Sequence, residues 1–323
     1  MDRRTFSKKA VGALMGASVI TTAARAEKIS GGVKSTEPFK CKFAANIYKW
    51  TNICPNYTKR LSDVDKVKFW YDCGFRAMED NDMMKYAPEK RKALSEQIRK
   101  LGMDFGVFTS SIGGGLWLTA CKSDKRGAKP DKQAAIERIK AEAKKTVEIG
   151  REIGAKWTTV VIGKTDLSLE HSYQMANVVE QLKYAAEICE KSGLIMVLEP
   201  LSFTAHPGLW LQKTSDAYMI CKAVGSPSCK ILFDVFHQQN TEGSLIRNID
   251  AAWDEIAYYH LGDVPKRTEP GSGEINFKNL IKHIHDKGYR GIYGMEHLQS
   301  DKSPAGDAKL INYYRQIDHY VNG

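Results

Sequence analysis

The sequence predicts one α/β domain, a closed (β/α)8 barrel in which eight parallel strands alternate with eight helices. The first sign is a recurring order of amphipathic helix, glycine and short apolar strand, as at Gly154 before residues 157–162 and at Gly193 before residues 194–198. Glycine tolerates the left-handed conformation in which helices end, so each of these glycines marks a turn from helix to strand. The second sign is that eight such units fit into one domain of this length, which favours a closed barrel.

The expected strands are short apolar runs near residues 42–47, 75–79, 104–109, 157–162, 194–199, 230–235, 257–261 and 291–296. The helices are expected near residues 62–73, 88–101, 131–153, 169–192, 214–224, 244–255, 276–287 and 306–320. A doubly wound open sheet would also alternate strands and helices, but it rarely reaches eight units in this length. The first strand also lacks the glycine-rich phosphate-binding turn of dinucleotide folds.

The first 26 residues have the features of a twin-arginine signal peptide. The pair Arg3-Arg4 precedes an apolar stretch at residues 11–20, and residues 24–26 (Ala-Arg-Ala) have the form of a cleavage site. The apolar stretch is too short to span a bilayer, so we expect no permanent membrane anchor and a periplasmic location. Residues 27–38 are expected to form a flexible linker, and residues 39–323 are expected to form the barrel.

The charge pattern does not predict nucleic-acid binding. The formal net charge is +10, but the lysines are scattered among glutamates on helical faces, without a continuous basic stripe. The seven cysteines are odd in number and lack CxxC spacing, which predicts buried thiols instead of a disulfide framework. We therefore expect a small-molecule partner, while association into a homo-oligomer stays open.

Four apolar strands in the second half of the chain each end in a potential metal ligand. The ligands are Glu199, Asp234, His260 and Glu296, at separations of 35, 26 and 36 residues, about the length of one strand-helix unit. Because the parallel strands of a barrel carry their last residues to the same rim, we expect these side chains to converge. Three carboxylates and one imidazole suit Mn²⁺ or Mg²⁺, and Zn²⁺ or Co²⁺ also fit. The sequence therefore predicts one divalent metal ion at this rim.

Glu199 and Glu296 belong to non-adjacent strands and would flank a substrate chelated to the metal. Such a pair can move a proton, because one carboxylate removes it from carbon while the metal stabilises the enediolate oxygen. Return of the proton to the neighbouring carbon is aldose–ketose isomerisation, and return to the opposite face of the same carbon is epimerisation. We therefore expect both residues to be catalytic on a small sugar or hydroxy-ketone.

Four further polar residues are expected at this rim as substrate-binding groups. His237 and Arg267 lie in the loops after the sixth and seventh strands, and Asn46 and Glu79 end the first and second strands. The alternative for each residue is a capping or surface role. The glycine-rich segments 110–125 and 269–276 are expected to be mobile loops, which either cover a small substrate or serve as disordered connectors.

Several motifs resemble the xylose isomerase-like family of TIM barrels. They are Leu198-Glu199-Pro200-Leu201, Phe233-Asp234-Val235-Phe236-His237, Tyr259-His260-Leu261-Gly262-Asp263, Gly294-Met295-Glu296 and the sequence RTEPGSGEIN at residues 267–276. The last of these is typical of hydroxypyruvate isomerase-like members, and residues 42–46 match their first strand. The resemblance covers nearly all of residues 39–323.

The resemblance to the hydroxypyruvate isomerase and ketose 3-epimerase branch implies roles for the rim residues. Both glutamates would be metal ligands as well as the acid/base pair, and Asp234 and His260 would complete the metal shell. The same resemblance implies that His237 and Arg267 contact substrate oxygens.

Two positions depart from the hydroxypyruvate isomerases. Those enzymes carry an amide where His260 stands, whereas the epimerases carry histidine. Ala205 and His206 also replace an acidic residue that these enzymes often have shortly after the first glutamate. These changes leave the substrate open, and an exported protein is not expected to act on cytoplasmic hydroxypyruvate.

Three other functions are compatible with the same barrel. A lyase of the keto-sugar or inosose dehydratase type begins with the same proton abstraction and then loses a β-hydroxyl. A non-catalytic exported sugar-binding protein would need no carboxylates on two faces of its ligand. An endonuclease would need a three-metal cluster, whereas the sequence offers one ligand set.

Overall fold

The computed structural model describes residue 33, residues 35–47 and residues 52–323. The signal peptide expected at residues 1–26 lies outside the described residues, as does most of the linker expected at residues 27–38. Within the described part of the chain, no helix is both long enough and apolar enough to cross a membrane.

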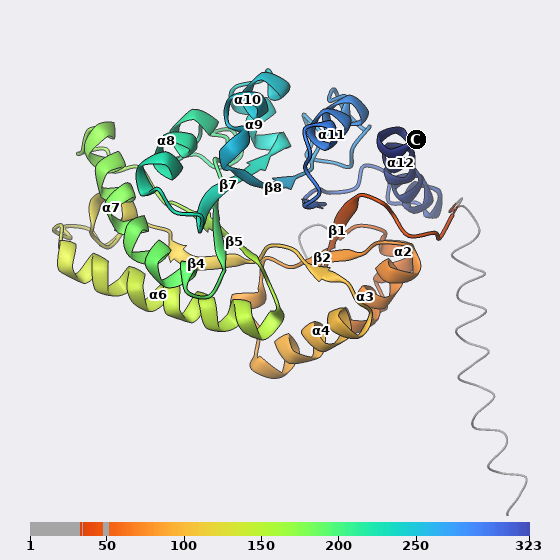
Figure 1. Ribbon diagram of the computed structural model, residues 1–323, viewed down its shortest axis with the longest axis horizontal. Coiled ribbons are helices and arrows are strands. Elements are labelled where there is room, and N and C mark those ends of the chain that lie inside the picture. Colours follow the sequence, from red (N-terminus) through yellow and green to blue (C-terminus); the bar gives the residue numbers. More distant parts are fainter. Residues whose placement is uncertain (1–32, 34, 48–51) are drawn as a thin grey trace, which may run out of the picture.

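The strands form one parallel sheet, in the order β3-β2-β1-β9-β8-β7-β6-β5-β4 (Figure 1). Its members are β1 (Lys42–Asn46), β2 (Ala77–Glu79), β3 (Asp104–Phe105), β4 (Thr109–Gly113), β5 (Trp157–Val161), β6 (Ile195–Leu198), β7 (Cys229–Asp234), β8 (Ile256–His260) and β9 (Ile292–Gly294). The edge strands β3 and β4 are consecutive pieces of one segment. Between them, the Gly106 N–H donates to the Met78 carbonyl (2.7 Å), and the Thr159 N–H donates to the Phe108 carbonyl (2.9 Å). These bonds link the segment to β2 on one side and to β5 on the other, so the predicted barrel is confirmed.

The third strand differs from its prediction, because it is broken into β3 and β4. A Cβ atom on Gly106 would lie 2.3 Å from the Tyr258 hydroxyl oxygen, so this glycine leaves room for a tyrosine inside the barrel. A glycine in a strand often marks such a close approach. The strand then resumes and continues to Gly113, four residues beyond the expected end at 109.

The helices surround the barrel and follow the expected order. They are α2 (Pro55–Thr58), α3 (Asp63–Asp72), η1 (Met83–Lys85, a 3-10 helix), α4 (Pro88–Lys100), α5 (Trp117–Ala120), α6 (Lys132–Ile153), α7 (His171–Glu190), α8 (Thr214–Val224), α9 (Val235–Thr241), α10 (Leu245–Ala251), η2 (Trp253–Glu255), α11 (Phe277–Asp286) and α12 (Pro304–Asn322). The helix expected at 244–255 is divided into α10 and η2. The short helices α2, η1, α5 and α9 were not predicted, because three to seven residues are too few to show a helical period.

Two apolar cores hold the barrel together. The larger core lies between the sheet and the helices. The smaller one fills the barrel itself and consists of Ala44, Ala77, Val107, Val197, Leu232, Tyr258 and Ile292. Because the barrel interior is packed with apolar side chains, the polar residues at the strand ends collect at the C-terminal rim.

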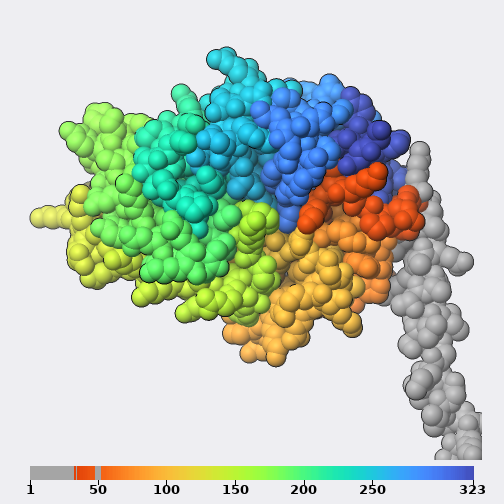
Figure 2. Space-filling view, in the orientation of Figure 1, coloured from red at the N-terminus to blue at the C-terminus, as the bar shows by residue number. Residues whose placement is uncertain are grey.

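The two ends of the domain are joined to each other. Asp318 in α12 accepts hydrogen bonds from the backbone N–H groups of Lys40 (3.1 Å) and Cys41 (2.7 Å), just before β1. Figure 2 shows the dark blue C-terminal segment beside the first described residues, in red. The last helix therefore fixes the first strand between β2 and β9.

Candidate active site at the C-terminal rim

The four predicted ligands converge at one point of the rim. Glu199 follows β6, Asp234 ends β7, His260 ends β8 and Glu296 follows β9. One ligand atom from each residue lies within 4.8 Å of those from the other three. The His260 Nδ1 atom lies 2.9 Å from Glu296 Oε2, 3.6 Å from Glu199 Oε1 and 3.9 Å from Asp234 Oδ2.

The residues present fit a divalent cation. Glu199 Oε1 and both ring nitrogens of His260 are buried and have no hydrogen-bond partner among the described residues. A buried polar atom without a partner is costly, so such atoms in a cluster call for a ligand. Three carboxylates and one imidazole are a donor set for a hard or borderline divalent cation.

Charge coupling makes the two glutamates different from each other. Burial raises the pKa of Glu199 to about 7. Burial acts in the same direction on Glu296, but His260 and Arg267 outweigh it and hold the pKa of Glu296 well below its usual range. For His260, burial alone would lower the pKa, yet the carboxylates of Glu296 and Glu79 raise it well above the usual value. The site therefore combines a carboxylate that readily holds a proton with one that readily stays ionised.

Arg267 bridges two members of the cluster. Its Nη2 atom donates to Asp234 Oδ2 (2.8 Å) and to Glu296 Oε2 (2.7 Å). The backbone of Arg267 adopts a left-handed conformation (φ 51°), which turns the side chain in this loop back toward the rim. A terminal guanidinium nitrogen carries two N–H groups, so Nη2 can hold both carboxylates at once.

His237 lies beside the cluster, and one of its ring nitrogens has no hydrogen-bond partner among the described residues. The Ser202 backbone N–H donates to His237 Nδ1 (3.4 Å), so Nδ1 is the acceptor and the proton lies on Nε2. Nε2 is buried without a hydrogen-bond partner and lies 3.8 Å from Asp234 Oδ2. Burial lowers the pKa of His237 to about 4, so the ring is neutral at pH 7 and can donate one hydrogen bond.

Glu79 and Asn46 lie next to the cluster. Glu79 is fully buried, and its Oε2 atom lies 3.6 Å from His260 Nε2 and accepts a hydrogen bond from the Tyr258 hydroxyl (2.7 Å). The Asn46 side-chain amide donates to Glu79 Oε1 (3.3 Å). Both residues therefore lie behind His260, whereas a different set of residues faces the cavity.

A cavity of about 750 Å³ opens onto the cluster. It is lined by Asn81, Asp82, Met84, Lys85, Thr109, Ser110, Ser111, Lys145, Val161, Glu199, Leu201, Ala205, His206, Phe236, His237, Arg267 and Glu296. Two glutamates, His237 and Arg267 thus share one space with the polar strand β4. The residues expected to bind substrate are divided, since His237 and Arg267 line the cavity and Asn46 and Glu79 do not.

Some residues of the site were missed by sequence reasoning. The Asn81 side-chain amide donates to Glu296 Oε1 (2.7 Å), and Ser202 orients His237. Ser111 lines the cavity from a segment that was expected to be a loop. Their positions just after strand ends were the available signal, since Asn81 follows Glu79 by two residues and Ser202 follows Glu199 by three.

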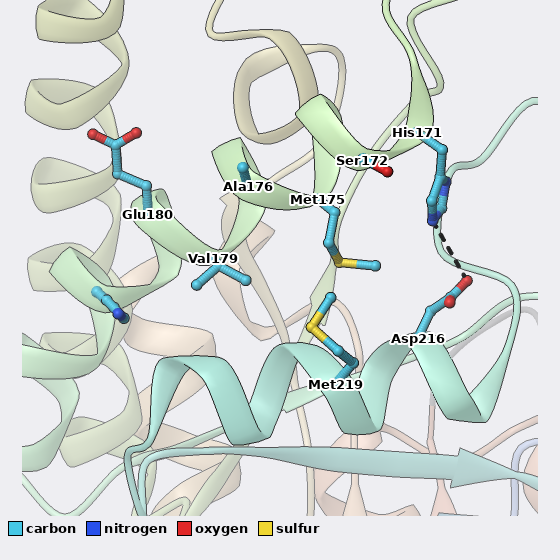
Figure 3. Close-up of a pocket in the computed structure, with 9 residues that line it drawn as sticks. His171, Ser172, Met175, Ala176, Val179, Glu180, Asp216 and Met219 are labelled. Carbon is cyan, nitrogen blue, oxygen red and sulfur yellow. Dashed lines mark ion pairs between the residues drawn. The ribbon is translucent and has the colours of Figure 1, made fainter.

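A second cavity, of about 730 Å³, lies in the helical layer between α7 and α8. Figure 3 shows Met175 and Met219 pointing toward each other across it, with the His171–Asp216 ion pair (3.9 Å) at one end. Among the described residues, the candidate metal cluster borders the rim cavity and not this one.

Comparison with known proteins supports the same assignment of the fold. Residues 67–317 match the family model described as xylose isomerase-like TIM barrel. The chain belongs to this family. Hydroxypyruvate isomerase of Escherichia coli (strain K12) is 32% identical over 160 residues, which are 50% of this chain and 62% of that protein. The matched segment thus spans less than two thirds of this relative.

Solved structures of other proteins have a similar fold. A family 2 AP endonuclease from Brucella melitensis superposes with a TM-score of 0.69 at 18% identity, covering 85% of this chain and 98% of that one. An L-ribulose 3-epimerase superposes with a TM-score of 0.65 at 16% identity, covering 85% and 94% of the two chains. At this level of identity the likeness concerns the fold alone.

Proposed function

We propose that this chain is a metal-dependent isomerase or epimerase of a small hydroxy-ketone or sugar. The observation that carries the proposal is the convergence of three carboxylates and one imidazole beside a cavity, with buried ligand atoms that lack hydrogen-bond partners. The similarity to hydroxypyruvate isomerase supports the same class of reaction, proton transfer next to a carbonyl.

The ligand set would be Glu199, Asp234, His260 and Glu296. A divalent cation held there supplies polarisation of the substrate carbonyl and stabilises the negative charge that develops on its oxygen. Mn²⁺ or Mg²⁺ suits the three carboxylates, and Zn²⁺ or Co²⁺ is compatible with the imidazole.

The two glutamates would perform the proton transfer. One carboxylate removes the proton from the carbon next to the carbonyl, and the other, in its protonated form, returns a proton to the enediolate. Glu199 and Glu296 follow the non-adjacent strands β6 and β9 and both line the cavity, which supports this division of labour. Which carbon, or which face, receives the proton separates isomerisation from epimerisation.

Two other residues would orient the reactants. The Nε2–H group of His237 donates to a substrate oxygen, and its neutral state leaves the charge of the site unchanged. Arg267 holds the carboxylate of Glu296 and that of Asp234 in place.

Solvent exchange tests this mechanism. We expect the Mn²⁺-loaded protein in heavy water to incorporate deuterium at the α-carbon of a hydroxy-ketone or ketose from a panel of such compounds. Glu199→Gln and Glu296→Gln should each lower the exchange rate by about 10²- to 10⁴-fold, because each removes one proton-transfer group. Glu274→Gln, the same change at an exposed position of the rim, should leave the rate unaltered.

Each other outcome has a defined meaning. Intact exchange in both Gln variants would show that the two-carboxylate mechanism is wrong. A product lighter by one water would identify a lyase, and calorimetric binding of a sugar without exchange would identify a binding protein.

We also propose that the chain is exported by the twin-arginine route to the periplasm. The support is the pair Arg3-Arg4, the following apolar stretch and the Ala-Arg-Ala sequence at residues 24–26. Fractionation of expressing cells tests this, since a variant with lysine at both arginine positions should stay in the cytoplasm.

A further inference from the structure

Strand β4 differs from the other strands of the barrel. Strands of a parallel barrel are usually buried on both faces and apolar, as β6 is with the sequence IMVL. By contrast, β4 has the sequence TSSIG, and its first three residues are half-buried. A polar, partly exposed strand in the wall of a barrel needs an explanation.

The partial exposure of β4 follows from the sheet topology. Met78 in β2 is level with Phe105 in β3, and β2 ends one residue later, at Glu79. The chain then continues upward as β4, which pairs with β5 alone among the described strands. On its other side β4 contacts η1, and α6 runs alongside it (Figure 1).

The rim cavity extends along this open side. The same space that reaches Glu199 and Glu296 is also lined by Ser110 and Ser111 from β4 and by Lys145 from α6. We count each non-hydrogen atom of a ligand at the ~30 Å³ that one water molecule occupies in the liquid. On this upper bound, a three-carbon keto acid fills about 200 Å³ and a free hexose about 360 Å³. The cavity of about 750 Å³ is therefore large for either of them.

The lining beside β4 carries hydrogen-bonding groups that are not satisfied. Ser111 Oγ is a buried atom without a partner among the described residues. Ser110 Oγ donates to the Thr159 carbonyl (3.0 Å), and its lone pairs remain available to accept. Met84 provides an apolar surface in the same part of the cavity.

This combination fits the hydroxyl groups of a sugar ring. Neighbouring sugar hydroxyls act as donors and acceptors, and the hydroxyls of Ser110 and Ser111 offer both kinds of partner. Lys85 is already paired with Asp82 (2.7 Å), so the lining is not simply a cationic pocket for a carboxylate.

We propose that the β4 side of the cavity is a second sugar subsite, which binds a glycosyl group attached to the reacting sugar. This inference rests on the proposed function, because it assigns the reacting sugar to the space beside Glu199 and Glu296. It makes the substrate a glycosylated ketose instead of a three-carbon keto acid.

Filling the subsite tests the proposal. In the Mn²⁺-loaded full chain, the probes are D-fructose and its glucosyl derivatives maltulose and isomaltulose, with exchange in heavy water as the readout. We expect kcat/KM for a glucosyl-fructose to exceed that for D-fructose by about tenfold or more, equivalent to about 1.4 kcal/mol. Ser111→Leu should lower this ratio by about tenfold, and Ser111→Ala by less, because alanine leaves the space open.

A matched control uses the other cavity. Ser172→Leu places the same substitution on the exposed surface of α7 and should leave the ratio unchanged. The proposal is wrong if Ser111→Leu lowers kcat/KM equally for all probes. It is also wrong if kcat/KM is higher for hydroxypyruvate than for the sugars and Lys145→Met removes that difference. The latter result would assign the region to a carboxylate.

Failure of the proposed function is distinguishable. If no probe exchanges its proton, calorimetry of the metal-loaded protein with maltulose and isomaltulose still tests the subsite. Binding that Ser111→Leu weakens and Ser172→Leu does not would support it. The proposal would be overturned if neither sugar binds, or if Ser111→Leu leaves the affinity for them unchanged.

Discussion

Glu79 is a buried carboxylate that contacts one member of the cluster, His260. Its Oε2 atom lies 3.6 Å from His260 Nε2, on the side of the ring opposite to the nitrogen that faces the other carboxylates. Gly294 makes this arrangement possible, since a Cβ there would lie 2.3 Å from Glu79 Oε2 and 2.5 Å from His260 Cδ2. A carboxylate behind a metal-binding histidine orients the ring and increases its basicity.

We therefore expect Glu79→Gln to weaken metal binding. The amide keeps the shape and can still accept from Tyr258, but it removes the charge behind His260, so Mn²⁺ affinity should fall by about 10- to 100-fold. Titration calorimetry of the purified protein measures this change.

The control is a carboxylate of similar burial that does not touch the cluster. Glu255 is paired with Lys230 (2.5 Å) at the start of β8, and Glu255→Gln should leave Mn²⁺ affinity unchanged. Equal affinities in Glu79→Gln and the unaltered protein would show that Glu79 is structural only.

At the scale of elements, the segment between β8 and α11 positions Arg267. Asp263 organises this segment, because its carboxylate accepts hydrogen bonds from four backbone N–H groups, those of Val264, Gly271, Gly273 and Ile275. Farther on, Glu269 accepts bonds from the N–H and the hydroxyl of Ser300. The loop is thus built around buried carboxylates and is not a loose cover.

Asp263→Asn tests this positioning role. The amide nitrogen cannot accept the bonds from Gly271 and Gly273, so we expect faster hydrogen exchange across residues 268–275 and a stability loss of about 1–3 kcal/mol. Because Arg267 would then be less well held, kcat/KM should fall by about tenfold or more while Mn²⁺ affinity stays nearly unchanged. Faster exchange together with normal kcat/KM would show that the hydrogen bonds of Asp263 are not needed to position Arg267.

The third strand shows a limit of sequence reasoning at this scale. Residues 110–113 are predicted as the start of a loop, since Ser-Ser-Ile followed by three glycines lacks the apolar pattern of a buried strand. They form most of β4 because β5 offers an unpaired edge beyond the end of β2. Pairing with a neighbour 50 residues away overrides the local propensity.

At the scale of the whole molecule, the site is the meeting point of strands from both halves of the chain. The cluster brings three carboxyl groups together, and it is stabilised in the folded chain by Arg267 and His260. A cation that binds the folded state alone must therefore stabilise the entire barrel.

We expect Mn²⁺ to raise the Tm of the protein. At a hundredfold excess over Kd the gain is about 2.7 kcal/mol, which for a domain of this size corresponds to roughly 5–10 °C. Calorimetry with and without a chelator measures the shift. The double variant Asp234→Asn, Glu199→Gln should lose most of it, and an equal shift in that variant would place the cation elsewhere.

The sequence by itself determined the barrel and the four convergent ligands. Strand order follows from the alternation of helix and strand, and the last residue of each strand must reach the same rim, so Glu199, Asp234, His260 and Glu296 could be named from spacing alone.

Only the tertiary structure decided which of the other polar residues face the cavity and which lie behind the cluster. Glu79 and Asn46 lie behind His260, Arg267 bridges two carboxylates, and β4 opens one side of the cavity. The reason is physical, because these contacts join residues far apart in the chain, such as Tyr258 and Glu79, at a sequence separation of 179. Local pattern carries no information on distances of that kind; the packing of the whole barrel sets them.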